Sequence, residues 1–100
     1  MSGPYTNEAQ QRILRLVQTL AGHERSGMAP SDIARAQECS APMVTRDMAN
    51  LVEAGLAEKV PDTGHWRLAP PLMQIAVKFM TALDQDRKKL AETENRYTRS

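Results

Sequence analysis

The side chains of this sequence that are best suited to chemistry are polar groups that can donate and accept hydrogen bonds. One set lies in residues 31–50 and combines hydroxyl, guanidinium, amide and thioether groups: Ser31, Arg35, Ser40, Met43, Thr45, Arg46 and Asn50. A guanidinium binds a guanine edge or a phosphate, and hydroxyl and amide groups both donate and accept hydrogen bonds. We therefore predict that these residues contact double-stranded DNA.

A second set surrounds a turn in the stretch EKVPDTGHWRLAP, residues 58–70. Two short runs with some alternation flank Pro61–Gly64, and this pattern favours a β-hairpin with strands at 56–60 and 65–68. Polar and basic side chains lie along its edges and at its tip: Lys59, Thr63, His65 and Arg67. We predict that they also contact DNA, although charge on an edge strand also serves to prevent aggregation. Trp66 is expected to pack in the core.

Catalytic chemistry is not supported by the residue types present. The sequence has no glycine-rich phosphate loop, no recognisable Ser/His/Asp arrangement and no carboxylates that are forced together. His23 and His65 are distant in sequence and have no cysteine partners, so a metal site is not expected either. We expect a protein that is not an enzyme and that uses no cofactor and no metal.

Length and charge limit the domain count and the kinds of partner. One hundred residues, of which 41% are hydrophobic, suit one domain with a modest core. The net charge is +1, and residues 40–67 hold three basic and four acidic side chains, a net of −1. A DNA partner is therefore predicted from the pattern of residues and not from their charge.

The sequence also bears on location. It has no run of about 18 apolar residues that would span a membrane, and its N-terminus lacks the basic and apolar regions of a secretion signal. The single cysteine, Cys39, excludes an internal disulfide and suits a reducing compartment. We expect a cytoplasmic protein with no membrane contact.

Three helices are predicted before the hairpin. The first begins after Thr6 or Asn7, which are good N-caps, and ends at Gly22. The second begins at Pro30, and the third covers residues 41–54. Two short helices that follow a longer one are the skeleton of a helix-turn-helix.

The third predicted helix has an apolar face and a mixed face. The residues that we assign to the core face are Val44, Met48, Leu51 and Val52. The residues that we assign to the opposite face are Met43, Thr45, Arg46, Asp47, Asn50 and Glu53. This mixed face is suited to a DNA major groove, which is about 12 Å wide.

The hairpin turns this motif into its winged variant. We therefore predict a mainly α fold: a winged helix-turn-helix with a three-helix core, a two-stranded β-wing and a long C-terminal helix. The predicted domains are a disordered arm at 1–5, a winged helix-turn-helix DNA-binding domain at 6–69 and a C-terminal helix at 70–100.

The last predicted helix carries a seam of apolar residues. Positions at alternating spacings of four and three are mostly apolar, which is typical of a helix that pairs with another. The residues that we assign to dimerisation are Leu72, Ala76, Phe79, Leu83, Leu90 and Tyr97. We predict a homodimer; the alternative is that this face packs within a monomer.

The stretch MAPSDIARAQECSAPMVTRDMANLVEAGLAEKVPDTGHWRLAPPLMQIA resembles the N-terminal DNA-binding domain of the IclR-type transcription regulators. The matching elements are SDIARA, VTRDMANLVEAGLAEK and DTGHWRL, and the resemblance spans roughly residues 8–76. It implies that residues 41–54 are the recognition helix and that the tip at 61–65 contacts the DNA backbone. Asp47 stands where the family commonly has an apolar residue, and an acidic group near phosphates would lower affinity.

We therefore predict a sequence-specific, dimeric transcription regulator that binds double-stranded DNA. Members of the family continue into an effector-binding domain, whereas this sequence stops at Ser100 and is either a stand-alone winged domain or a fragment. The sensing of small molecules is therefore not carried over, and we expect no ligand-sensing domain and no small-molecule ligand in this chain. One alternative is a winged-helix protein–protein interaction module, which the net charge of −1 over residues 40–67 favours. The other is a phage-type accessory protein for DNA packaging or replication.

Overall fold

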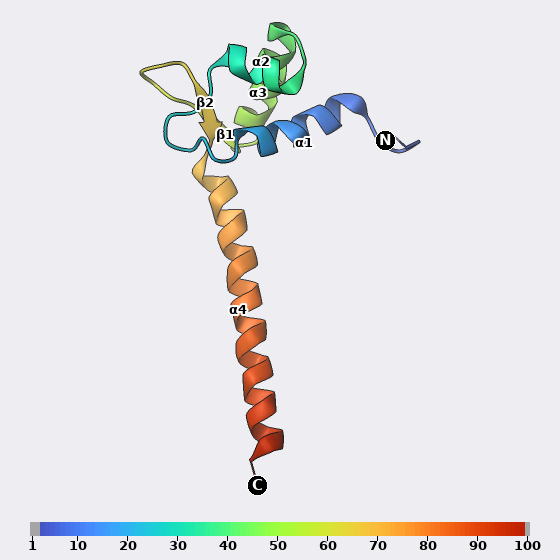
Figure 1. The fold of residues 1–100 in the computed structure, drawn as a ribbon, viewed down its shortest axis with the longest axis vertical. Helices are drawn as coiled ribbons and strands as arrows, with labels where there is room; N and C mark the ends of the chain where they lie inside the picture. The colour runs from blue at the N-terminus through green and yellow to red at the C-terminus, as the bar shows by residue number, and fades with distance from the viewer. Residues whose placement is uncertain (1–2, 100) are drawn as a thin grey trace. The chain divides into compact units, whose positions relative to one another are not determined.

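A computed structural model describes residues 3–99 and confirms a mainly helical winged-helix fold (Figure 1). The elements in chain order are α1 (Glu8–Leu20), α2 (Pro30–Gln37), α3 (Ala41–Glu53), β1 (Ala57–Lys59), β2 (Trp66–Leu68) and α4 (Pro70–Thr98). The chain divides into two units, one ending at Pro70 and the other beginning at Pro71. Residues 1–2 of the predicted arm lie outside the described residues. Where the arm meets α1, the Thr6 amide donates a hydrogen bond to the Gly3 carbonyl at 3.1 Å.

Local signals explain where α1 begins and which face it buries. The Asn7 side chain accepts a hydrogen bond from the Gln10 amide at 3.1 Å and so caps the helix. Of the two predicted caps, Asn7 is therefore the one used. Leu16 and Leu20 are fully buried and are spaced four residues apart, as a helix that packs on one face requires.

The turn between α2 and α3 is formed by a left-handed residue and a serine cap. Glu38 has a φ of 52°, and the Cys39 amide donates to the Ala34 carbonyl at 3.0 Å, which closes the end of α2. The Ser40 hydroxyl then accepts from the Met43 amide at 3.4 Å and starts α3. The predicted cap at Ser40 and the predicted start of α2 at Pro30 are both confirmed.

One core holds the three helices and β1 together. Its buried members are Leu16, Leu20, Ile33, Val44, Met48, Leu51 and Ala57. The assignment of Val52 to the core face of the third helix is wrong, because this side chain is 42% exposed. Val52 is turned by about 100° from Leu51 around the helix axis, which places it outside the buried stripe.

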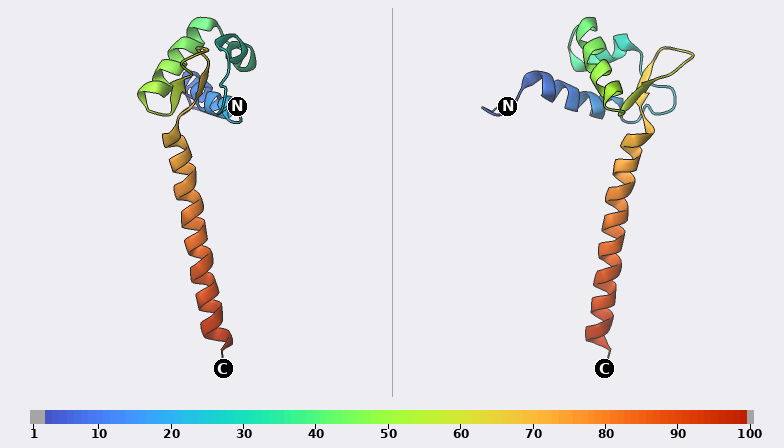
Figure 2. Two further views of the ribbon diagram at one scale, coloured as in Figure 1. Left: turned by 90° about the vertical axis from the view of Figure 1, so that its left-hand side faces the viewer. Right: turned by 180° about the vertical axis from the view of Figure 1, so that it is seen from behind.

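The hairpin is shorter than predicted and has an unpredicted neighbour. Its strands pair antiparallel, with Glu58 opposite Arg67 and Lys59 opposite Trp66. Met28 lies on the other side of Trp66, and their backbones exchange two hydrogen bonds, of 2.8 and 2.9 Å. The loop between α1 and α2 therefore lies beside the hairpin (Figure 2).

α4 is described by itself. It extends over 29 residues, all within the described part of the chain, and buries none of them. Its large apolar side chains are mostly exposed, including Phe79 at 63% and Leu90 at 60%. Among the described residues, no helix is both long and apolar enough to cross a membrane.

Candidate nucleic-acid interface

The outward face of α3 is the first part of the candidate interface. Val44, Met48 and Leu51 hold the helix against the core, so the opposite face, with Arg46 and Ala49, is exposed. Within residues 3–99, the Arg46 guanidinium forms no ion pair. An exposed guanidinium without a carboxylate partner is available to a guanine edge or a phosphate.

Two other predicted contact residues on α3 are hydrogen-bonded to their own helix. The Thr45 hydroxyl donates to the Ala41 carbonyl at 3.2 Å, and the Asn50 amide donates to the Arg46 carbonyl at 2.9 Å. Both side chains are exposed, and each keeps further hydrogen-bonding capacity, since a hydroxyl also accepts and an amide group has two hydrogens. Met43, at 37% exposure, completes this outward set.

Asp47 does not belong to the outward face, and its assignment there is wrong. The residue is only 3% exposed, and its carboxylate accepts two hydrogen bonds from Arg12 of α1, at 2.6 and 3.0 Å. The hydrogen bond that Arg12 donates to Asp47 raises the pKa of Arg12. The spacing explains the burial, because Asp47 lies three residues after Val44 and four before Leu51, on the same stripe. An acidic group is thus removed from the surface that would meet phosphates.

The predicted residues of α2 are exposed at its surface. Ser31 is the second residue of the helix, and Arg35 forms a 3.2 Å ion pair with Asp32, in which both side chains are largely exposed. A pair of this kind is worth little and opens readily, so Arg35 stays accessible. Ser40 is also exposed, but its hydroxyl is used as the α3 cap.

The predicted cations of the hairpin are engaged within the protein. The Arg67 guanidinium donates to the Glu58 carboxylate at 2.7 Å and to the Arg25 carbonyl at 3.1 Å. The Lys59 ammonium lies 5.0 Å from the centroid of the Trp66 ring, within the range of a cation–π contact.

The tip of the hairpin carries two more predicted contact residues. The His65 ring nitrogen Nδ1 lies 3.2 Å from the Ser26 carbonyl oxygen. The Thr63 hydroxyl accepts from the His65 amide at 3.2 Å, which closes the turn. Thr63 and Pro61 are exposed, so the tip itself is accessible.

The loop before α2 is a functional candidate that the sequence patterns did not indicate. Arg25 of this loop is exposed, and its backbone carbonyl accepts a hydrogen bond from Arg67 of the hairpin. The guanidinium of Arg25 is therefore a further basic group beside the hairpin. In the same loop, the Gly22 amide donates to Glu24 at 2.9 Å and lowers the pKa of that carboxyl. The only sequence signal was a polar segment between two glycines, Gly22 and Gly27.

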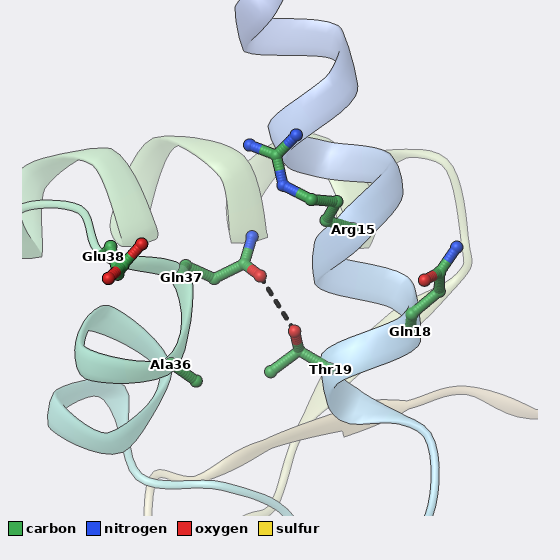
Figure 3. A pocket seen from close by; sticks show the side chains of 6 residues that line it. All are labelled: Arg15, Gln18, Thr19, Ala36, Gln37 and Glu38. Carbon is green, nitrogen blue, oxygen red and sulfur yellow. Dashed lines mark hydrogen bonds between the residues drawn. The ribbon is translucent and has the colours of Figure 1, made fainter. Parts of the chain in front are cut away.

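An open, polar cleft of about 490 Å³ lies between α1 and α2 (Figure 3). Its lining residues are Arg15, Gln18, Thr19, Ala36, Gln37 and Glu38. The Thr19 hydroxyl donates to the Gln37 side chain across it at 2.8 Å. Among the described residues, no group of His, Cys, Asp or Glu is arranged to hold a metal ion.

The predicted dimerisation residues of α4 are all accessible to some degree. Leu72 is half-buried, and the others are exposed, from Leu83 at 43% to Tyr97 at 83%. Exposed apolar side chains that recur along one helix are typical of a surface that another helix covers. Their role in dimerisation stays a prediction.

Two crystal structures are similar to this fold. One is assigned to an IclR transcriptional regulator from Silicibacter sp. TM1040; it is 25% identical, with a TM-score of 0.65 over 80% of this chain. The other is an IclR family transcriptional regulator from Brucella abortus, which is 16% identical, with a TM-score of 0.63 over 81% of this chain. This chain spans about a third of the length of either protein, 32% in both cases. No family model and no curated protein matches the sequence. The fold is thus that of an IclR-like winged-helix domain.

Proposed function

We propose that this IclR-like winged-helix domain is a transcription regulator that binds double-stranded DNA in a sequence-specific manner through α3. The observation that carries the proposal is the outward face of α3, where Arg46 is exposed and, within residues 3–99, forms no ion pair. The similarity to the Silicibacter regulator supports the same role.

The shape of the outward face suits close approach to bases. Pro42, Arg46 and Ala49 follow one another at spacings of four and three residues and therefore share a stripe opposite the core. The two residues next to Arg46 on this stripe are thus compact, which lets this part of the helix enter a major groove of about 12 Å. The stripe continues to Glu53 at the C-terminal end of α3, one turn beyond Ala49. In this position Arg46 would read a guanine, and Asn50 an adenine.

The remaining contacts would position the protein on the DNA backbone. Phosphate contacts give register and orientation but no sequence information. The residues proposed for them are Ser31, Arg35, Ser40, Lys59, Thr63, His65 and Arg67, with Arg25 added from the structure. Because the hairpin cations are already engaged, we expect the hairpin to contribute orientation more than affinity.

A homodimer that forms through α4 is part of the proposal. The exposed apolar residues of α4, among them Phe79 and Leu83, would be covered by the same residues of a second copy. Two recognition helices would then bind two half-sites together, which offsets the low charge of each domain. Such a regulator would act in the cytoplasm.

In vitro selection of bound DNA from a random library tests the proposal, with the wild-type chain and Arg46→Ala compared. We expect the wild type to select a motif with two-fold symmetry that contains a guanine in each half-site. The Arg46→Ala variant should lose the preference at that guanine. Recovery of no motif by the wild type, at low salt and with the dimer established by sedimentation, would overturn the proposal.

A protein–protein interaction module is the second candidate. The engaged cations of the hairpin and the net charge of −1 over residues 40–67 favour it. This function predicts that any DNA binding is lost at physiological salt, because non-specific binding depends on phosphate contacts alone. It also predicts that Arg46→Ala leaves the cellular activity unchanged.

A further inference from the structure

A buried ion pair joins α1 directly to α3. The Arg12 guanidinium donates from Nε to Oδ2 of Asp47 at 2.6 Å and from Nη2 to Oδ1 at 3.0 Å. The two side chains are only 13% and 4% exposed. This two-point geometry fixes the orientation of the carboxylate as well as its distance, unlike a single hydrogen bond or an apolar contact.

A residue at the end of α2 is hydrogen-bonded to the backbone of the same arginine. The backbone carbonyl of Arg12 accepts a hydrogen bond from the side-chain amide of Gln37 at 2.9 Å. The side-chain oxygen of Gln37 in turn accepts from the Thr19 hydroxyl at 2.8 Å, as Figure 3 shows. A chain of directional bonds therefore runs through all three helices and ends at Asp47. The apolar core around it supplies attraction without direction.

Stability alone does not account for a pair in this position. Removing two charges from water offsets most of their attraction, and apolar residues of similar volume often replace a buried pair at no loss. Asp47 directly follows Arg46, so the two side chains leave α3 about 100° apart. A rotation of α3 about its axis that moved Asp47 would turn Arg46 by the same angle.

We propose that Arg12 and Asp47 are positioning residues that set the rotation of α3 on the domain and thereby the direction in which Arg46 is presented. The part of this proposal that concerns DNA specificity rests on the proposed function. The orientation of α3 can be measured without DNA.

The test replaces the pair by apolar residues of similar length, Arg12→Met with Asp47→Leu, in the full chain. A second variant, Arg12→Gln with Asp47→Asn, keeps polar groups but loses the charged two-point bond. The control is Asp84→Asn with Lys88→Gln, which removes the exposed 3.4 Å ion pair of α4. For each variant, residual dipolar couplings report the orientation of α3 against α1, and thermal unfolding reports stability.

The expected result separates specificity from stability. The apolar variant should keep its melting temperature, show a changed or less ordered α3 orientation, and lose about tenfold or more of its preference for the selected site over random DNA. Its affinity for random DNA should stay about the same, because non-specific binding comes from phosphate contacts, which carry no sequence information and do not depend on a base contact by Arg46. The α4 control should match the wild type in all four quantities.

The failure of this inference is distinguishable from the failure of the proposed function. Couplings of α3 that are unchanged in both pair variants overturn the positioning role, whatever the DNA results. If the couplings of α3 change in the pair variants, the positioning role is supported, even if the wild type selects no DNA motif. The absence of a motif would then overturn only the proposed function. If the apolar variant does not fold, the couplings of the Gln/Asn variant decide.

Discussion

α3 and the hairpin both carry basic side chains at their surface, but only α3 leaves its basic group uncommitted. Arg46 is exposed and, among residues 3–99, is in no ion pair, whereas Arg67 of the hairpin is bonded to Glu58 and to the Arg25 carbonyl. Lys59 lies over the Trp66 ring. The difference teaches that the number of basic residues in a segment does not measure the charge that it can offer to a partner.

The physical reason is the way in which each element is held. α3 packs on the core through Val44, Met48 and Leu51, which are almost fully buried, so Arg46 on its outer face is not needed to hold the helix in place. The hairpin has strands of three residues, too short to be stable by themselves. It is held by side-chain bonds and by its bridge to Met28, and its cations are used for this purpose.

The largest expected effect is a loss of stability when Gly27, which lies against the hairpin, is replaced. This residue has a φ of 74°, and an added Cβ would lie 2.7 Å from the Trp66 carbonyl oxygen. We expect Gly27→Ala to lower the free energy of unfolding by about 2–4 kcal/mol, from the left-handed backbone and the clash together. Urea unfolding measures it.

Gly22→Ala is the matched control for this change. Gly22 also has a positive φ, of 94°, but nothing lies within 4 Å of its added Cβ. Its loss should be about 1–2 kcal/mol, since the backbone conformation alone is penalised. Equal losses in the two variants would mean that the approach of Gly27 to the hairpin is not important for stability.

The second prediction compares the two basic groups in DNA binding. Arg46→Ala should weaken binding to the selected site by about 1–3 kcal/mol, as the loss of a two-point contact to a base does. Lys59→Ala should weaken it by less and equally for all sequences, because its contact would be to phosphate. Titrations at several salt concentrations measure both. If Lys59→Ala has the larger effect, the hairpin and not α3 is the main contact.

The third prediction releases a hairpin cation instead of removing one. Glu58→Gln removes the partner of Arg67 in an ion pair whose side chains are 27% and 38% exposed. Stability should fall by about 0.2–1 kcal/mol, the range for surface pairs. Affinity for DNA should rise at low salt, because the charge of Arg67 is no longer balanced by a carboxylate, although its hydrogen bond to the Arg25 carbonyl remains.

Glu92→Gln in α4 makes the same change in net charge and serves as the control. Its effect on affinity should be smaller than that of Glu58→Gln. The same rise in both variants would show that net charge, and not the release of Arg67, determines affinity.

The smallest expected effect concerns the loop beside the hairpin. The Gly22 amide lowers the pKa of Glu24 below its ordinary value of 4.5, so the ionised carboxylate stabilises the folded state. This contribution is present above pH 4.5 and is lost as the pH falls through the lowered pKa of the folded state. Glu24→Gln should therefore reduce the melting temperature slightly at pH 7, and the difference should close as the pH falls through the lowered pKa of Glu24. A difference that persists in acid would contradict this assignment.

The sequence predicted the elements well because their signals are local. Asn7 and Ser40 as caps, Pro30 at a helix start and the periodic leucines of α1 act within a few residues of one another. The hairpin was predicted from its turn residues, and its strands proved shorter at their ends. The prediction of the candidate site was less complete, because it treated each basic residue as free.

The error at Asp47 shows why. Its spacing placed it on the buried stripe of α3, but its residue type suggested the surface, and no pattern within the helix could resolve the conflict. Arg12, four residues before Leu16 on the buried stripe of α1, carries the complementary charge at a matching position. A charged residue on the core stripe of one helix and an opposite charge on the core stripe of another together indicate a buried ion pair. This signal is found only when two helices are compared, not when each helix is considered alone.

By itself, the sequence determined the helices, the hairpin and the apolar part of the α3 core stripe, Val44, Met48 and Leu51, because caps, glycines and apolar periodicity act over a few residues. The tertiary structure decided which charges remain available. Arg12 and Asp47 are separated by 35 positions, and Arg67 and Arg25 by 42. Contacts at such separations depend on the rotation and packing of whole elements, and a turn of about 100° is enough to exchange a surface residue for a buried one.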